Sequence, residues 1–153
     1  MEVTTPDWET FRNGLASSVA ALPDGGVLIV GDRERTPCFV QFLFSRDQIV
    51  AEVASGWDQL GRPNLSDEEF AALERIGWPP PERDPSLNHG LRLPWPARSA
   101  DYRRVADMCV AALRDVFEIP SPASLCYKAF VSPSGDALLM PRLGIPSPAD
   151  WRL

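Results

Sequence analysis

The sequence has no run of apolar residues long enough to cross a membrane, which takes about 20 such residues in an α-helix. Its first residues, MEVTTPDWETF, have neither the basic start nor the apolar stretch of a signal peptide. It contains only 3 cysteines, and their wide spacing is typical of reduced thiols rather than of a disulfide framework. These absences predict a cytoplasmic protein that does not bind membranes.

Lysine and histidine are nearly missing, since Lys128 and His89 are the single residues of each type. The net charge is -6, and the arginines form no basic stripe. Because phosphate binding needs clustered Lys and Arg, we expect no nucleic-acid partner. No metal is expected either, because one histidine and three scattered cysteines lack the close ligand spacing of a zinc site. The glycines around VLIV (27–30) match no nucleotide-binding fingerprint, so no cofactor is predicted.

The sequence predicts no catalytic residue. A nucleophilic pair would have to join His89 to Cys38, Cys109 or Cys126. Cys109 falls on the apolar stripe of a predicted helix, and the other two thiols fall in predicted strands, where a buried inert thiol is the usual outcome. His89 is interpreted as a surface residue of a loop, and the acids between 67 and 74 as a solvated helix face. We therefore expect a protein that is not an enzyme.

The composition is that of a folded globular chain: 44% of the 153 residues are apolar and 24% are charged. This length fits one domain spanning residues 1–153. Three segments have the apolar spacing of amphipathic helices. Their predicted ranges and end signals are 8–22 with Thr5 as N-cap, 65–78 with a Ser66 and Glu69 capping box and Gly77 as C-cap, and 99–119 with Ser99 as N-cap.

Short apolar runs after the first helix predict a β-meander. The runs at 27–30, 38–45 and 48–55 are joined by loops short enough for antiparallel pairing, and weaker strands are predicted at 124–131 and 137–140. The predicted fold class is therefore α+β, an antiparallel meander packed by the N-terminal and C-terminal helices. The side chains expected to make this contact are Phe11, Leu15, Val105, Cys109 and Val116.

Residues 78–96 contain three consecutive prolines and no clear periodicity, apart from a short extended stretch at 91–93. We expect this loop to be an ordered, extended band that Trp78 and Asn88 anchor: the ring folds back on the preceding helix, and the amide bonds nearby backbone groups. Trp57 and Trp95 are candidate partner-binding residues, because large rings in loops bury either in their own domain or against a partner.

The order of these elements resembles the TY-Chap N-terminal domain of actinobacterial proteins, which is grouped with type III secretion chaperones and YbjN-like proteins. The resemblance covers about residues 8–130 and leaves out a C-terminal arm, 141–153. It implies a type III secretion chaperone-like fold, no catalytic residues, and a chaperone-like or adaptor surface for an unidentified protein partner, in a monomer or a homodimer. The stretches that carry it are FVQF (39–42), AEVASGWDQL (51–60), LSDEEFAALERIGWPPP (65–81), Asn88 and AALRDVFEIPSPASLCYKAF (111–130).

Two other classes of function stay open at this point: a regulatory domain that senses a small ligand between sheet and loop, and, last, a hydrolase. A protein binder would have an exposed apolar patch or an open sheet edge. A sensor would have a closed pocket with a few polar groups, and an enzyme would have convergent titratable groups.

Overall fold

The computed structural model describes residues 5–35, 38–84, 87–94 and 96–151. Within them, a six-stranded antiparallel sheet has the strand order β4-β3-β2-β1-β5-β6. The elements are α1 (Trp8–Ala20), β1 (Gly26–Asp32), β2 (Phe39–Ser45), β3 (Gln48–Val53), α2 (Asp67–Ile76), β4 (His89–Arg92), α3 (Ser99–Ala111), η1 (Ala112–Val116), η2 (Pro122–Ser124), β5 (Leu125–Val131), β6 (Asp136–Ala137) and η3 (Pro141–Leu143).

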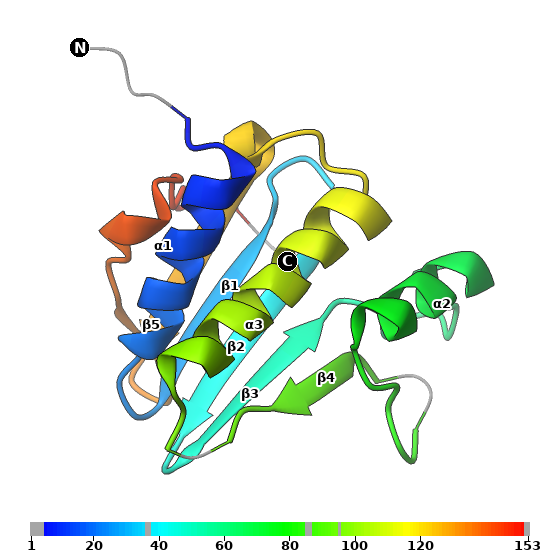
Figure 1. Cartoon of the computed structure of the whole chain (residues 1–153), viewed down its shortest axis with the longest axis horizontal. Coiled ribbons are helices and arrows are strands. Elements are labelled where there is room, and N and C mark those ends of the chain that lie inside the picture. Colours follow the sequence, from blue (N-terminus) through cyan, green and yellow to red (C-terminus); the bar gives the residue numbers. More distant parts are fainter. Residues whose placement is uncertain (1–4, 36–37, 85–86, 95, 152–153) are drawn as a thin grey trace.

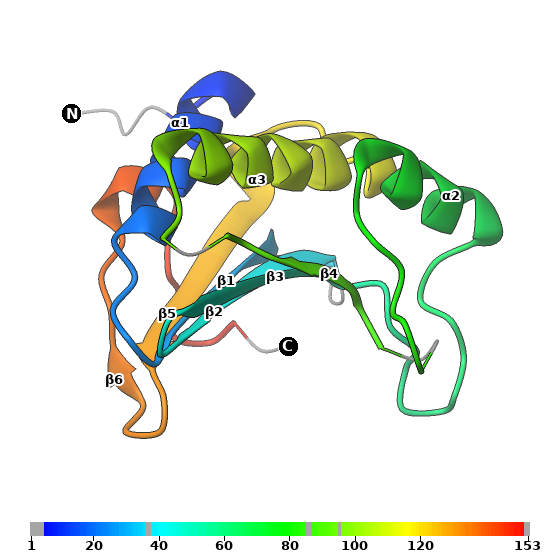
Figure 2. The same ribbon diagram turned by 60° about the horizontal axis from the view of Figure 1, so that its bottom comes forward.

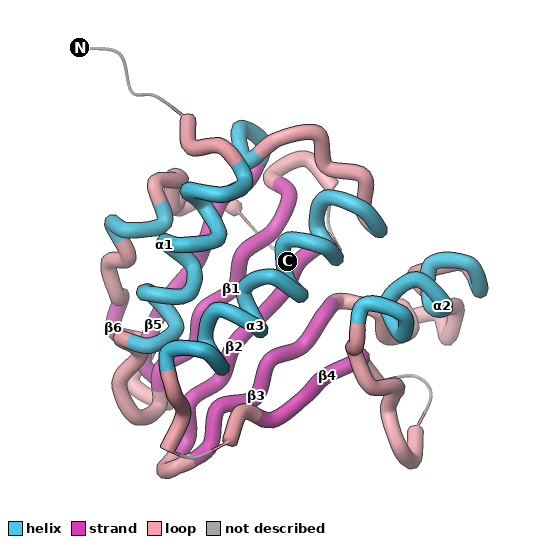
Figure 3. The backbone as a smooth tube through the Cα atoms, in the orientation of Figure 1, coloured by secondary structure: helices cyan, strands magenta, loops and turns pink. Residues whose placement is uncertain are grey.

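Helices α1 and α3 lie side by side on one face of the sheet, while α2 lies at its β4 side (Figures 1 and 2). Figure 3 shows the strands as neighbouring magenta tubes behind these helices. β1 is the central strand, with β2 on one side and β5 on the other, and all seven of its residues are buried. The predicted α+β fold class, with an antiparallel meander packed by the first and last helices, is confirmed.

The helix-to-sheet contact is the one expected from the apolar spacing. Phe11, Leu15, Val105 and Cys109 are at most 1% exposed, and Val116 is 6% exposed. They pack on inward-facing strand residues such as Leu28 and Phe42, and together these side chains form the main hydrophobic core. Burial of this apolar surface is the chief favourable contribution to folding.

The helix starts differ from the prediction at two of the three sites. The capping box of Ser66 and Glu69 is present and confirmed. The N-cap of α1, however, is Asp7, whose carboxylate accepts the Thr10 N–H at 2.7 Å, because a negative charge at this position also interacts well with the helix dipole. The N-cap of α3 is Arg98, and Ser99 is already helical.

The end of α3 also departs from the expected regular helix. After Ala111 the chain widens into the π-helical segment η1, where the Phe117 N–H bonds the carbonyl of Ala112. The wider turn removes the i,i+4 spacing, so the expected pair of Arg114 with Glu118 is wrong, and Arg114 pairs with Asp115 instead. The other expected pair, Arg103 with Asp107, is also wrong, because Asp107 bonds Arg12 on α1.

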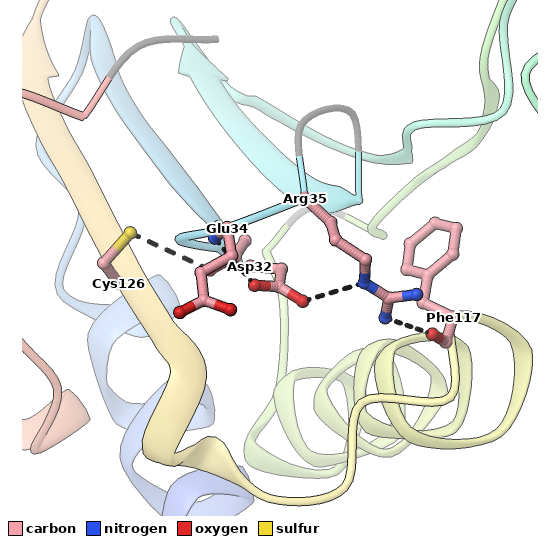
Figure 4. A network of polar contacts seen from close by, with 6 residues as sticks. Asp32, Glu34, Arg35, Phe117 and Cys126 are labelled. Carbon is pink, nitrogen blue, oxygen red and sulfur yellow. Dashed lines mark hydrogen bonds and ion pairs between the residues drawn. The ribbon is translucent and has the colours of Figure 1, made fainter.

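A polar network ties the loop after β1 to this helix end (Figure 4). The buried carboxylate of Asp32 accepts the Glu34 N–H at 2.9 Å and the Arg35 Nε–H at 3.1 Å. Arg35 also donates to the carbonyl of Phe117, and its hydrogen bond with Asp32 raises the pKa of the guanidinium. A cation at a helix C-terminus is favourable, so this contact helps to hold the sheet and α3 in one arrangement.

The first turn of the C-terminal arm packs directly on α1. A Cβ added to Gly14 would lie 2.0 Å from the carbonyl oxygen of Arg142. We predict that Gly14→Ala lowers the free energy of unfolding by about 1–3 kcal/mol through overpacking against a backbone atom, even though alanine favours a helix by about 1 kcal/mol. Urea unfolding checks this, with Ser17→Ala on the same helix as the control. Equal stability of the two variants would contradict the close contact.

Candidate functional site

The outer edge of β4 presents backbone groups that the sheet does not use. Leu93 donates its N–H to Ile49, so in the antiparallel register the residues that bond β3 are His89, Leu91 and Leu93. Gly90 and Arg92 therefore point their backbone groups outward. The Gly90 N–H bonds the carbonyl of Pro79 at 3.3 Å. Within the described residues, the Gly90 carbonyl and the Arg92 N–H have no protein partner; we call this the β4 edge.

Two cavities flank the β4 edge, one on each face of the sheet. The first, which we call the slot, lies on the helix side and has a volume of 190 Å³. Its apolar lining comes from Leu91, Leu93, Val105 and Met108, and Asp101 and Arg104 are at its rim. The second, which we call the groove, is on the open face and has a volume of 840 Å³. Its walls include Val50, Glu52, Leu87, Asn88 and the prolines 79–81.

The proline wall of the groove is held at both ends by side chains that the sequence singled out. Trp78 is 1% exposed, and its indole N–H donates to the carbonyl of Met108 on α3 at 3.1 Å. At the other end, the Asn88 side-chain oxygen accepts the N–H groups of Ser55 at 3.1 Å and Gly56 at 2.7 Å. These contacts place the band between residues 78 and 88 beside β4.

The two tryptophans predicted to bind a partner stand differently. Trp57 is 42% exposed and follows Gly56, whose N–H is bonded to Asn88, so it stands at the Asn88 end of the groove. Trp95 lies outside the described residues. The groove itself could not be found from the sequence, because Val50 and Glu52 come close to the prolines only through the pairing of β3 with β4.

The interpretation of His89 as a surface residue is wrong, because its side chain is only 4% exposed. The backbone N–H donates to the Ser55 hydroxyl at 2.7 Å, and the ring Nδ1 lies 2.8 Å from the same oxygen. The ring stacks on Phe70 of α2, with centroids 5.5 Å apart. Burial lowers the pKa of His89, while the charge of Glu74 acts in the opposite direction. These contacts join the start of β4 to the end of β3 and to α2.

Other chemically capable side chains are distributed over the fold. Cys109 and Cys126 are buried free thiols, Cys38 is half-buried, and burial raises the pKa of each. In the described part of the chain, no group of three His, Cys, Asp or Glu side chains is placed to hold a metal ion. No helix among the same residues is both long and apolar enough to span a membrane.

The burial of Trp78 leads to a stability prediction. Trp78→Ala removes a buried ring and its hydrogen bond to Met108, so we expect the free energy of unfolding to fall by about 3–5 kcal/mol. Trp57→Ala is the matched control and should change it by less than about 0.5 kcal/mol, because the ring is largely exposed. Chemical unfolding of both variants checks this. Equal losses would show that Trp78 does not anchor the loop.

The environment of His89 predicts a pH dependence. A histidine whose folded-state pKa lies below its ordinary value of 6.5 stabilises the fold fully above that pH, and this stability is lost as the pH falls below it. We expect the free energy of unfolding to decrease between about pH 7 and pH 5, before most carboxylates titrate. His89→Gln should be less stable at pH 7 but have a flatter profile. Identical pH profiles for the two proteins would rule out this role.

Comparison with known proteins identifies the family of the chain. The family TY-Chap3, described as T3SS (YopN, CesT) and YbjN peptide-binding chaperone 3, matches residues 1–131. No curated protein and no solved structure matches. The matched region runs from α1 through β5 and so includes the β4 edge, the slot and the groove, whereas the C-terminal arm lies beyond it. The TY-Chap resemblance is thereby confirmed, and the chain belongs to the TY-Chap3 family of peptide-binding chaperones.

Proposed function

We propose that this protein is a single-domain, non-catalytic chaperone or adaptor that binds an extended segment of a partner protein as an added strand on β4. The observation that carries the proposal is the β4 edge, where the Gly90 carbonyl and the Arg92 N–H face outward between two cavities. Addition of a strand to an open sheet edge is a common mode of peptide recognition, and the family is a peptide-binding one.

The two cavities suit the side chains of an added strand. Successive side chains of a strand point to opposite faces, so a peptide on β4 would direct alternate residues into the slot and into the groove. A cavity of about 150 Å³ accommodates a benzene ring, so the slot, at 190 Å³, holds one apolar side chain against Val105 and Met108. The wider groove has room for larger side chains against Val50 and the prolines.

The charges around the site favour broad rather than strongly charge-selective binding. Glu52 and Glu82 line the groove with Arg92, and Asp101 faces Arg104 at the slot. Because the two signs are mixed, affinity would come mainly from backbone hydrogen bonds, each contributing about 0.5–1.5 kcal/mol, and from apolar burial. A proline wall that is already ordered loses little conformational entropy on binding.

The alternative of a small-ligand sensor fits the cavities less well. Pockets for small molecules usually have volumes of about 300–1,000 Å³ and enclose most of the ligand. The slot is smaller than this, and the groove runs along an exposed strand edge rather than into the interior. The exposed ring of Trp57 at the Asn88 end of the groove also suits a partner that extends beyond β4.

A backbone substitution tests the proposal. Arg92→Pro removes the outward N–H without removing a bond to β3, and proline is tolerated on an edge strand. Arg92→Ala, the matched control, removes the guanidinium but keeps the N–H. The native chain is first used to select ligands from a library of 12-residue peptides, and the affinities of both variants for the selected peptides are then measured by fluorescence anisotropy.

We expect Arg92→Pro to weaken peptide binding at least tenfold, while Arg92→Ala changes it by less than threefold, with similar melting temperatures for both. Equal affinities of the two variants would place the peptide elsewhere. Failure of the native chain to select any peptide would contradict peptide binding itself. Light scattering of the free protein shows whether a homodimer buries the same edge.

A further inference from the structure

The second edge of the sheet, on β5, is occupied by the chain itself. β6 pairs only with Phe130 and Val131, which leaves the rest of the β5 edge without a strand. The C-terminal arm supplies the missing partners: the Tyr127 N–H donates to the carbonyl of Pro146 at 3.0 Å, and the Ser147 hydroxyl donates to the carbonyl of Tyr127 at 2.7 Å. A proline-containing segment is thus already bonded to a sheet edge of this protein.

The arm passes around this edge from one face of the sheet to the other. Leu143 is 1% exposed in the main core, on the helix side, and Ile145 packs against the same core. Trp151 is 6% exposed and belongs to a separate apolar cluster on the opposite face. Figure 2 shows the C-terminal end of the chain on the side of the sheet away from α1 and α3.

The ring of Trp151 rests in a shallow depression of the open sheet face, which we call the seat. Its walls are Val27 and Ile29 of β1 and Cys126 of β5. Gly31 lies beneath the ring, where an added Cβ would be 3.1 Å from the ring atom Cζ2, so a glycine permits this close approach. A neighbouring groove of 560 Å³, lined in part by Phe130 and Pro148, continues from the seat.

The seat and its occupant have different relations to the family. Val27, Ile29, Gly31 and Cys126 lie within the region that matches TY-Chap3, residues 1–131. Trp151 and the whole arm lie outside it. Sheet residues of the peptide-binding domain are therefore covered, in this chain, by a segment that is not part of the matched domain.

We infer that the arm is an internal, displaceable ligand, and that the β5 edge with the seat is a second peptide site. The ligand class is an extended, proline-containing segment with an aromatic side chain, because this is the chemistry of the segment that occupies the site in the structure. The inference goes beyond the proposed function, because it concerns the opposite edge of the sheet.

The contacts of the arm allow the segment 145–151 to leave while η3 stays. Gly144 has a φ of 68°, a left-handed conformation that suits a hinge, and the buried Leu143 before it anchors η3. A ligand held by a short tether has an effective concentration in the millimolar range, so a peptide added to the native chain competes poorly. Removal of the Trp151 ring weakens the tethered ligand and opens the seat.

The test uses full-length protein and a fluorescent peptide with the sequence of residues 144–151, GIPSPADW. We expect this peptide to bind the Trp151→Ala chain at least tenfold more tightly than the native chain. The control peptide GIPSPADA should bind neither. Arg142→Ala, an exposed change elsewhere in the arm, is the control variant and should behave as the native chain.

Cys126 provides a second readout at the seat. Its side chain is 0% exposed, and burial raises its pKa to about 11, so alkylation by iodoacetamide should be slow in the native chain. Trp151→Ala should speed the alkylation of Cys126 at least tenfold, and saturating GIPSPADW should reverse the effect. Mass spectrometry of the cysteine-containing peptides measures this site separately from Cys38.

The outcomes separate the two sites. Equal affinity of GIPSPADW for native and Trp151→Ala chains, or unchanged alkylation of Cys126, would overturn the inference. So would failure of Trp151→Ala to fold, because a displaceable arm requires a fold that survives its release. Arg92→Pro combined with Trp151→Ala should bind the peptide as Trp151→Ala does, since the two substitutions concern opposite edges.

Discussion

An antiparallel sheet has two edges, and the backbone N–H and C=O groups along each must find partners in the protein, in water or in another chain. This constraint shapes both ends of the molecule. At β5 the requirement is met within the chain, because Pro146 and Ser147 bond Tyr127. At β4 the carbonyl of Pro79 meets it only for Gly90, and the Arg92 N–H is left facing outward.

The rest of the fold keeps the β4 edge in a fixed geometry. Trp78 fixes the proline segment to α3, and Asn88 fixes its other end to the turn after β3. His89 joins β4 to Ser55 and Phe70, so the short strand is held from below and from the α2 side. A peptide that pairs with β4 therefore meets a site whose walls are already ordered, which lowers the entropic cost of binding.

Local signals in the sequence were sufficient for much of this architecture. The short loops between apolar runs predicted the meander, and the Gly77-Trp78-Pro79 pattern predicted where α2 ends. The burial of His89 was missed because it depends on pairing with Val53, 36 positions earlier, which no local pattern encodes. The slot was missed for the same reason, since it joins Leu91 to Met108 through tertiary packing.

The most direct test of strand addition is the hydrogen exchange of the Arg92 amide, followed by NMR with a peptide selected by the native chain. The Leu91 amide is an internal control, because β3 already bonds it in the free protein. The account predicts that saturating peptide slows exchange at Arg92 at least tenfold and leaves Leu91 nearly unchanged. Unchanged exchange at Arg92, with protection appearing elsewhere on the protein, would contradict it.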